Sequence, residues 1–449
     1  MTMIHKFQFH DLNIAMDINS GAIHIISDIV YDILDFYPTE PKQAVISKLA
    51  DTYSIQELKE AFDEIETLKQ DGMLFADDSQ VTTAMLEGRG QVIKAMCLHV
   101  AHDCNMRCKY CFGDTGAFEG RRSMLSFETG KQAIDFLLTH SGTRRNLEID
   151  FFGGEPLMNF EVVKQLVAYG HEAEKALGKN IRFTITTNGL LLDEEKGRFI
   201  NENMENVILS IDGRPEVNDG MRRTPNGKGT YAAITDKYLN FVKDRKGTYY
   251  VRGTFTRENL DFSEDVKHLA DLGFRNISVE PVVTDASLSY ALREEDMERI
   301  YAEYDKLAEL YLHSIREGKS FEFFHFNIDL EQGPCVYKRV AGCGAGTEYV
   351  AVTPEGDIYP CHQFVGNPDF RLGNVAEDSF ENRLYGDFNR AHIYNKEKCR
   401  SCWAKFYCSG GCHANAYNAN GTLAEPYEMG CEMEKKRLEC AIGIRAALA

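Results

Sequence analysis

The sequence has no long apolar run. Over its 449 residues, no stretch approaches the roughly 18 consecutive apolar residues that a membrane-spanning helix needs. Residues 1–9 also hold no apolar run of signal-peptide length. We therefore expect a cytoplasmic protein with no membrane partner, long enough for more than one domain.

Basic residues are also scarce. Lys and Arg total 50 against 69 Asp and Glu, so the formal net charge is -19. Non-specific binding to nucleic acids relies on basic side chains that meet phosphates. This charge balance argues against a nucleic-acid partner.

Cysteine is missing from the whole middle of the chain, residues 112–334. Of the 13 cysteines, four lie between positions 97 and 111, and nine lie between positions 335 and 440. A disulfide framework is not expected in a reducing compartment. The distribution instead predicts two metal-binding regions on either side of a cysteine-free middle.

The first 75 residues predict a small unit of strands followed by helices. The Asn19-Ser20-Gly21 turn indicates a hairpin, and Ser54 with Glu57 forms a capping box at the start of a helix. This order is similar to a winged helix-turn-helix, but the last helix is rich in acidic residues, which disfavours DNA binding. Residues 76–93 are polar and form a linker. The expected strands cover residues 5–9, 13–17 and 22–26, and the expected helices cover 28–36, 41–51 and 54–72.

Residues 94–318 alternate strand and helix patterns. Such repeats predict an α/β fold in which a parallel sheet curves into a partial (β/α)6 barrel, with the chemistry at the carboxyl ends of the strands. The expected strands are 95–101, 147–152, 181–186, 207–211, 249–255 and 277–282. The expected helices are 127–140, 160–177, 194–203, 231–244, 263–272 and 294–317.

A run of three cysteines follows the first strand of this region. Cys104, Cys108 and Cys111 have the spacing C-x3-C-x2-C. Thiolates in such a loop bind iron-sulfur clusters or zinc. Structural zinc sites close four ligands, and no fourth ligand lies nearby in sequence. Three ligands on a four-iron cluster leave one iron open to a small-molecule chelate.

This spacing, with Tyr110 just before the third cysteine, resembles the radical S-adenosylmethionine (SAM) enzymes. In that family the amino and carboxylate groups of SAM chelate the open iron of a [4Fe-4S] cluster. The resemblance implies that Cys104, Cys108 and Cys111 hold the catalytic cluster and that Tyr110 lies at the cofactor.

Further motifs follow the predicted strands, where a barrel enzyme places its site. By resemblance, the turn Gly153-Gly154-Glu155-Pro156 hydrogen-bonds the SAM ammonium, with the Glu155 carboxylate holding the turn. Arg222 lies at the offset from Ser210 where related enzymes pair an arginine with the methionyl carboxylate, although Arg223 is an alternative. Glu280 ends the sixth strand and either faces substrate or adenine or simply stops the strand. The expected cofactor-binding residues are Tyr110, Gly153, Gly154, Glu155, Pro156, Thr187, Asn188, Ser210, Asp212 and Arg222.

The late cysteines match a second pattern. Seven of them, with Gly356, have the intervals of the SPASM extension of radical SAM peptide modifiers, which implies a SPASM domain at residues 319–449 with two auxiliary [4Fe-4S] clusters, three clusters in all. The fourth ligand of the proximal cluster has two candidates, Cys335 and the thiolate of a substrate cysteine. The expected distal ligands are Cys399, Cys402, Cys408 and Cys431, and the expected proximal ligands are Cys343, Cys361 and Cys412.

The whole chain resembles the radical SAM maturases of Cys-rich peptides in the SCIFF (six cysteines in forty-five) group. That likeness implies a peptide maturase that joins a cysteine sulfur to an α-carbon, a sactionine thioether. The N-terminal unit would bind the leader of the precursor peptide by strand addition. An external flavodoxin- or ferredoxin-type protein would supply electrons. The alternatives are sulfatase formylglycine formation, peptide epimerisation, or an iron-sulfur redox-sensing regulator.

Overall fold

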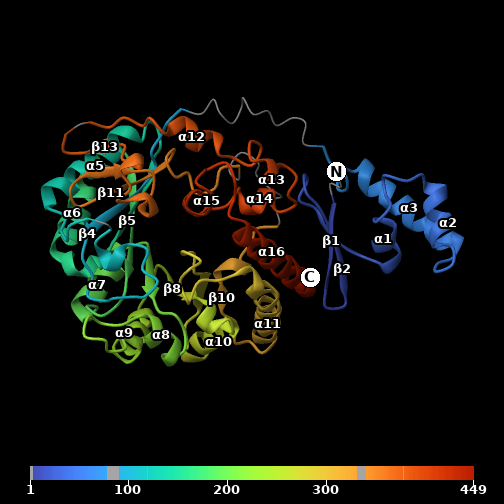
Figure 1. Ribbon diagram of the computed structural model, residues 1–449, viewed down its shortest axis with the longest axis horizontal. Coiled ribbons are helices and arrows are strands. Elements are labelled where there is room, and N and C mark those ends of the chain that lie inside the picture. The colour runs from blue at the N-terminus through green and yellow to red at the C-terminus, as the bar shows by residue number, and fades with distance from the viewer. Residues whose placement is uncertain (1–3, 78–89, 119, 331–339, 378) are drawn as a thin grey trace.

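The computed structural model describes residues 4–77, 90–118, 120–330, 340–377 and 379–449 (Figure 1). Its mixed α/β fold contains a large, mostly parallel sheet, a smaller antiparallel sheet at the N-terminus and a helical C-terminal region. Among the helices in these ranges, none combines the length and the apolar composition that crossing a bilayer requires.

The N-terminal unit is a three-stranded antiparallel meander in the order β1-β2-β3, with three helices beside it. Ser54 caps α3 as predicted, because its side chain accepts a hydrogen bond from the Glu57 backbone and Glu57 returns one to Ser54. Helix α1 is shorter than predicted, since turns replace its last residues before the Tyr37-Pro38 bond. The winged helix-turn-helix assignment stays a prediction. The elements are β1 (Ile4–Phe9), β2 (Leu12–Asp17), β3 (Ile23–Ile26), α1 (Asp28–Ile33), α2 (Lys42–Leu49) and α3 (Ile55–Gln70).

The large sheet has the strand order β10-β9-β8-β7-β6-β5-β4-β11-β12-β13. The six strands β4 to β9 are parallel and follow one another in sequence order, as the alternating pattern predicts. They are β4 (Ala95–Ala101), β5 (Asn146–Gly153), β6 (Asn180–Thr187), β7 (Asn206–Ser210), β8 (Thr248–Phe255) and β9 (Asn276–Pro281).

Helices connect these strands and cover the sheet (Figure 1). All six predicted helices are present, and their apolar faces join the strands in one core. Helix α8 was not predicted from the sequence. The helices are α5 (Phe127–His140), α6 (Phe160–Leu177), α7 (Glu194–Asn203), α8 (Pro215–Met221), α9 (Tyr231–Lys243), α10 (Phe262–Leu272) and α11 (Met297–Arg316).

The sheet continues past residue 319, where the sequence predicts a domain boundary. Strand β11 (Tyr349–Val352) pairs in parallel with β4, and β12 (Asp357–Tyr359) and β13 (Gly373–Asn374) extend it antiparallel. At the other edge, β10 (Glu322–Phe323) pairs with β9. Both edges of the six-stranded unit are therefore covered by the later part of the chain.

The C-terminal helix α16 (Glu428–Leu448) connects the two halves of the molecule. It lies between α11 and the N-terminal strand β1 (Figure 1). Gly443 permits this contact, because a Cβ there would lie 2.2 Å from the ring of Phe9. The shorter helices of this region are α12 (Tyr385–Arg390), α13 (Glu397–Arg400), α14 (Lys405–Cys408) and α15 (His413–Asn420).

Candidate active site

Cys104, Cys108 and Cys111 lie on one loop that begins where β4 ends. All three side chains are partly buried, and the pKa of the Cys104 thiol responds to charge on both Cys108 and Cys111. The structure therefore brings the predicted trio together. The backbone of this loop is tied to the end of α8, since Lys109 N donates to Met221 O at 3.0 Å.

The turn after β5 packs directly against this loop. Gly154 N donates to Ala101 O at 2.7 Å, and Glu155 N donates to Asp103 O at 2.9 Å. A Cβ on Gly154 would lie only 2.1 Å from Asp103 O. Glycine is required here because the two backbones approach more closely than any side chain allows. The cysteine loop and the glycine turn thus form one structural unit.

Glu155 joins the ends of β5 and β6. Its buried carboxylate accepts hydrogen bonds from Leu157 N at 3.0 Å, Thr187 Oγ1 at 2.7 Å and Asn188 N at 2.8 Å. Burial raises the pKa of Glu155 to about 7, and these hydrogen bonds oppose the rise. The bonds match the expected role of Glu155 in holding the turn. Asn188 Nδ2 in turn lies 3.5 Å from Cys104 Sγ.

A second polar group lies at the ends of β7 and β8. The Tyr110 hydroxyl donates to both carboxylate oxygens of Asp212, at 2.8 and 2.7 Å. Arg222 Nη2 lies 3.0 Å from Asp212 Oδ1, and the backbone of Thr254 donates to the same oxygen at 2.9 Å. Three residues expected to contact the cofactor therefore contact one another.

Arg222 keeps one donor for a further partner. Its side chain is buried, and within the described residues its Nε has no hydrogen-bond partner. Arg223, the alternative, is exposed, and its Nε donates to the backbone of Asp219. Both arginines adjoin the cysteine loop, since Arg107 N donates to Arg223 O at 2.6 Å, but it is the side chain of Arg222 that lies at Cys108. Ser210 ends β7 in register with Arg252, and Pro156 opens the short helix η2 (Pro156–Asn159).

The donors at this site suit a thiolate-bound cluster. Burial raises the pKa of the Cys104 thiol to about 12 and that of Cys108 to about 11, where the Arg222 charge opposes the rise. Thiols of this kind release their protons when a metal binds. In the described part of the chain, no three Cys, His, Asp or Glu side chains converge closely enough to hold a single metal ion. Each thiolate of a cubane binds a different iron, so a cluster does not require such convergence.

Among the described residues, seven of the late cysteines form two groups, and their assignment as cluster ligands stays a prediction. The pKa of the Cys361 thiol is raised to about 12. Burial is the largest cause, and negative charge on Cys412 and Cys343 adds to it. Cys335 lies outside the described residues. The other group lines a cavity of about 350 Å³ and consists of Cys399, Cys402, Cys408 and Cys431. Cys97 and Cys440 are fully buried: Cys97 packs in the same apolar cluster as Cys361, and Cys440 lies in the main core.

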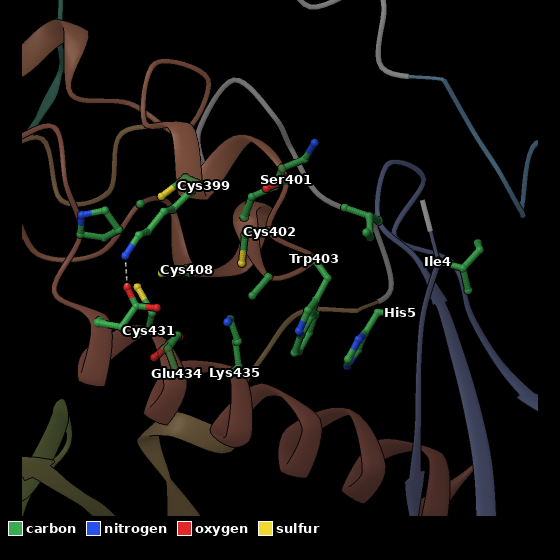
Figure 2. A pocket seen from close by; sticks show the side chains of 17 residues that line it. Ile4, His5, Cys399, Ser401, Cys402, Trp403, Cys408, Cys431, Glu434 and Lys435 are labelled. Carbon is green, nitrogen blue, oxygen red and sulfur yellow. Dashed lines mark hydrogen bonds and ion pairs between the residues drawn. The ribbon is translucent and has the colours of Figure 1, made fainter. Parts of the chain in front are cut away.

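Figure 2 shows the cavity between the C-terminal helices and the N-terminal sheet. The four cysteines lie on the side away from β1. On the other side, the rings of His5 and Trp403 stack with their centroids 3.8 Å apart and their planes 3° apart. His5 Nε2 also lies 3.0 Å from Glu439 Oε1 on α16. The N-terminal unit therefore forms one wall of this cysteine site.

Sequence reasoning missed several residues between the two cysteine regions. Phe112 directly follows Cys111, His362 directly follows Cys361, and their ring centroids are 5.5 Å apart. Burial lowers the pKa of His362 to about 4, so its ring is neutral at pH 7. Their position next to cysteines was the only signal in the sequence. These rings connect the first cysteine loop to the Cys361 group.

Glu280 lies in a partly buried ionic network. Its carboxylate is 3.1 Å from His325 Nε2, 3.7 Å from Arg252 Nε and 3.9 Å from Arg437 Nη1. Burial favours the neutral acid, but the contacts with His325, Arg252 and Arg437 hold the pKa of Glu280 well below its usual value. Arg437 comes from α16, and no sequence pattern had indicated it. Glu280 therefore does more than end a strand.

Comparison with known protein families matches two segments. Residues 86–234 match a family described as a 4Fe-4S single cluster domain, and residues 343–403 match one described as an iron-sulfur cluster-binding domain, SPASM. These segments contain the first cysteine loop and the start of the late cysteine region.

Among curated proteins, an uncharacterised protein of Methanocaldococcus jannaschii is 33% identical over 42% of this chain, which spans 62% of that relative's length. The cysteine-type anaerobic sulfatase-maturating enzyme of Clostridium novyi is 25% identical, and the match covers 70% of this chain and 86% of that enzyme's length. The antilisterial bacteriocin subtilosin biosynthesis protein AlbA of Bacillus subtilis is 24% identical, over 72% of this chain and 67% of its own.

Solved structures share the fold. The enzyme anSMEcpe with bound AdoMet has a TM-score of 0.64 and 20% identity, covering 79% of this chain and 99% of its own. SuiB of Streptococcus suis bound to its precursor peptide SuiA has a TM-score of 0.54 and 15% identity, covering 96% of this chain and 98% of its own.

The fold is α/β, and the two matched segments are similar to iron-sulfur domains, which supports the class of α/β iron-sulfur proteins. More specifically, the family models and the relatives together support an assignment of this chain to the radical SAM/SPASM enzymes. Maturases of peptides and proteins are frequent among these relatives.

Proposed function

We propose that this protein is a radical SAM/SPASM maturase that installs sactionine thioethers in a Cys-rich precursor peptide. The arrangement of its thiols carries the proposal: one group of three lies on the loop after β4, and two further groups lie in the C-terminal region. With several groups of thiols, one site can start a radical reaction and another can accept the electron that is released afterwards.

Cys104, Cys108 and Cys111 would hold the first [4Fe-4S] cluster, and the backbone of the Gly153-Gly154 turn would meet SAM. When bound, cluster and SAM supply the reducing electron and the hydrogen-abstracting adenosyl group. The free Nε of Arg222 suits the SAM carboxylate, while Asp212 orients the arginine. Thr187, Asn188 and Ser210 remain proposed contacts at the same strand ends.

The two later thiol groups would hold two auxiliary clusters. Cys399, Cys402, Cys408 and Cys431 supply four ligands to the distal one. The proximal group of Cys343, Cys361 and Cys412 leaves one position for Cys335 or for a substrate thiolate. The aromatic contact between Phe112 and His362 lies between the first and proximal sites, with Phe112 54% exposed.

The overall reaction balances as an oxidation of the peptide. The α-carbon loses a hydrogen atom, which becomes part of 5′-deoxyadenosine, and the substrate thiol loses its proton to solvent. The new carbon-sulfur bond then releases one electron, which replaces the electron that cleaved SAM. Each bridge therefore removes two hydrogens from the peptide and consumes one SAM.

The N-terminal sheet would bind the leader of the precursor peptide. Among the strands that the structure describes, β3 pairs with β2 alone, which leaves its other edge for an added strand, and Ile25 on it is 53% exposed. The match to anSMEcpe omits 21% of this chain, about the length of residues 1–93, whereas the match to SuiB omits only 4%. This difference supports a leader-bearing peptide over a folded sulfatase as substrate.

An anaerobic assay tests the proposal. The reconstituted protein is incubated with SAM, dithionite and a Cys-rich precursor peptide, and the product is analysed by tandem mass spectrometry. We expect a loss of two hydrogens per bridge and fragmentation at the α-carbon that carries sulfur. A precursor without its leader is the matched control and should react far more slowly. A flavodoxin- or ferredoxin-type protein should replace dithionite.

Sulfatase maturation is the second candidate, because the Clostridium novyi relative is matched over 86% of its length. Formylglycine formation from cysteine replaces sulfur by oxygen, and from serine it removes two hydrogens but joins no cysteine sulfur to an α-carbon. Epimerisation leaves the peptide mass unchanged. Either product, formed with 5′-deoxyadenosine, would replace the thioether proposal. A DNA affinity that rises steeply as salt falls would instead favour a redox-sensing regulator.

A further inference from the structure

Lys396 is buried as completely as the large aromatic core residues, with 1% of its surface exposed. It lies directly before α13, at the edge of the late cysteine region. Its Nζ donates to Gly410 O at 2.8 Å, between Cys408 and Cys412. Within the described residues, no Asp or Glu lies at ion-pair distance from this ammonium.

The charged groups that affect the pKa of Lys396 are cysteine thiolates. Burial lowers the pKa of Lys396, and negative charge on Cys399, Cys408, Cys431 and Cys412 opposes the change. The first three thiols belong to the proposed distal cluster and Cys412 to the proposed proximal one. Lys396 therefore lies between the two auxiliary sites.

A buried ammonium without an anion is costly, by several kcal/mol. Neighbouring lysines avoid this cost: Lys398 is exposed and pairs with Glu428, and Lys435 pairs with Glu432. For Lys396, the available anions are the thiolates and the sulfide-bridged clusters that they would hold. The structure thus contains a cation that needs a negatively charged partner at this place.

We propose that Lys396 is the counter-cation of the auxiliary clusters, a positioning residue that stabilises their reduced states and raises their reduction potentials. This inference rests on the proposed cluster sites. Reduction adds one negative charge to a cluster, and a fixed cation in a poorly solvated environment stabilises that charge. Such a setting would make the auxiliary clusters better acceptors for the electron released when the carbon-sulfur bond forms.

The test uses full-length protein in which Cys104, Cys108 and Cys111 are all changed to Ala, so that only auxiliary clusters are present. In this background we compare Lys396→Met, which removes the charge at similar length, with Lys396→Arg, which keeps it. Lys398→Met is the matched control, because it removes the same charge from an exposed side chain two residues away. Iron and acid-labile sulfide are counted, and reduction is followed by EPR at poised potentials.

We expect Lys396→Met to lower the reduced-to-oxidised ratio of an auxiliary cluster at least tenfold at a fixed potential, which corresponds to 59 mV for one electron. Lys396→Arg and Lys398→Met should change the ratio less than threefold. If Lys396→Met loses auxiliary iron while Lys396→Arg keeps it, this result also shows that the auxiliary clusters require a positive charge at this position.

Three results would overturn the inference. Unchanged potentials in Lys396→Met would remove the charge effect, equal shifts in Lys398→Met would make the effect non-specific, and equal iron loss in the Met and Arg variants would assign Lys396 to packing. A parent protein without any auxiliary iron would overturn the proposed cluster sites as well. The iron count therefore separates failure of the inference from failure of the proposed function.

Discussion

Cys104, Cys108 and Cys111 come from eight consecutive residues of one loop, whereas the later thiols are collected from residues 343–431. The first site is shaped by backbone: the glycine turn and the end of α8 hold its loop by main-chain hydrogen bonds. The second region is shaped by side chains and short helices packed around a cavity, with β1 as one wall. The comparison teaches that a metal site built from one loop depends on a rigid backbone. A site built from distant segments depends on the packing of the whole fold.

The largest expected effect comes from removing a ligand of the first site. Cys108→Ala should abolish formation of 5′-deoxyadenosine from SAM, because two thiolates cannot hold the cluster in place. The auxiliary iron should stay, since those thiols lie on other elements. Chromatography of the nucleoside product and iron counting check both statements. Loss of iron from all sites would show that the two regions do not form independently.

A second substitution tests the backbone of the first site. Gly154→Ala places a Cβ 2.1 Å from Asp103 O, so the cysteine loop must move. A displacement of this kind costs about 10²-fold in the rate of SAM cleavage. Gly220→Ala is the control, because no atom lies within 4 Å of its Cβ. Equal rates for the two variants would contradict the rigid-backbone account.

The buried ion pair of the first site should contribute to folding. Asp212→Asn leaves the Arg222 guanidinium buried beside an uncharged partner, which destabilises the protein by about 3–5 kcal/mol. Glu194→Gln breaks the exposed pair with Arg198 and should cost about 0.5 kcal/mol or less. Urea unfolding of the metal-free proteins measures both changes. Similar costs would show that burial of the Asp212 pair is unimportant.

Glu155 predicts a pH dependence at the first site. Its pKa is about 7 in the folded protein, above the ordinary 4.5, so folding favours the protonated carboxyl. That contribution is present at low pH and is lost as the pH rises from about 5 to about 7. The unfolding free energy of the wild type should therefore fall relative to that of Glu155→Gln over this range. Parallel pH curves would remove Glu155 as the titrating group.

The smallest effect belongs to the second region. His5→Ala removes the stack on Trp403, which contributes about 0.5–1.5 kcal/mol. Trp403 is the single tryptophan of the chain, so its fluorescence reports this contact directly. We expect a shift of its emission in His5→Ala and none in His313→Ala, where the side chain is 72% exposed. An unchanged emission in both would separate the N-terminal unit from the cysteine cavity.

Most strands and helices were predictable because their signals are local. Alternation and helical periodicity placed β4 to β9 and the long helices within a residue or a few of their observed ends. Helix α8 was missed because it is only seven residues long and lies between two motifs. Chelate spacing within a loop also limits which thiols can meet, and the predicted cysteine groups rest on that local signal.

Contacts between distant segments were not predictable in the same way. Nothing in the sequence indicated that β11 pairs with β4, or that α16 brings Arg437 to Glu280. The pairing of Arg222 with Asp212 also differs from the separate cofactor contacts that the motifs implied. These contacts depend on how whole helices and strands pack against one another, and short-range sequence patterns do not predict that packing.

By itself, the sequence determined the order of elements, the thiol spacing and the glycine turn, because these depend on neighbours a few residues apart. Only the tertiary structure decided that the sheet continues into the late cysteine region, that β1 closes one side of its cavity, and that Lys396 is buried between two groups of thiols. The physical reason is that burial and charge pairing are properties of the folded whole, which forms from segments far apart in the chain.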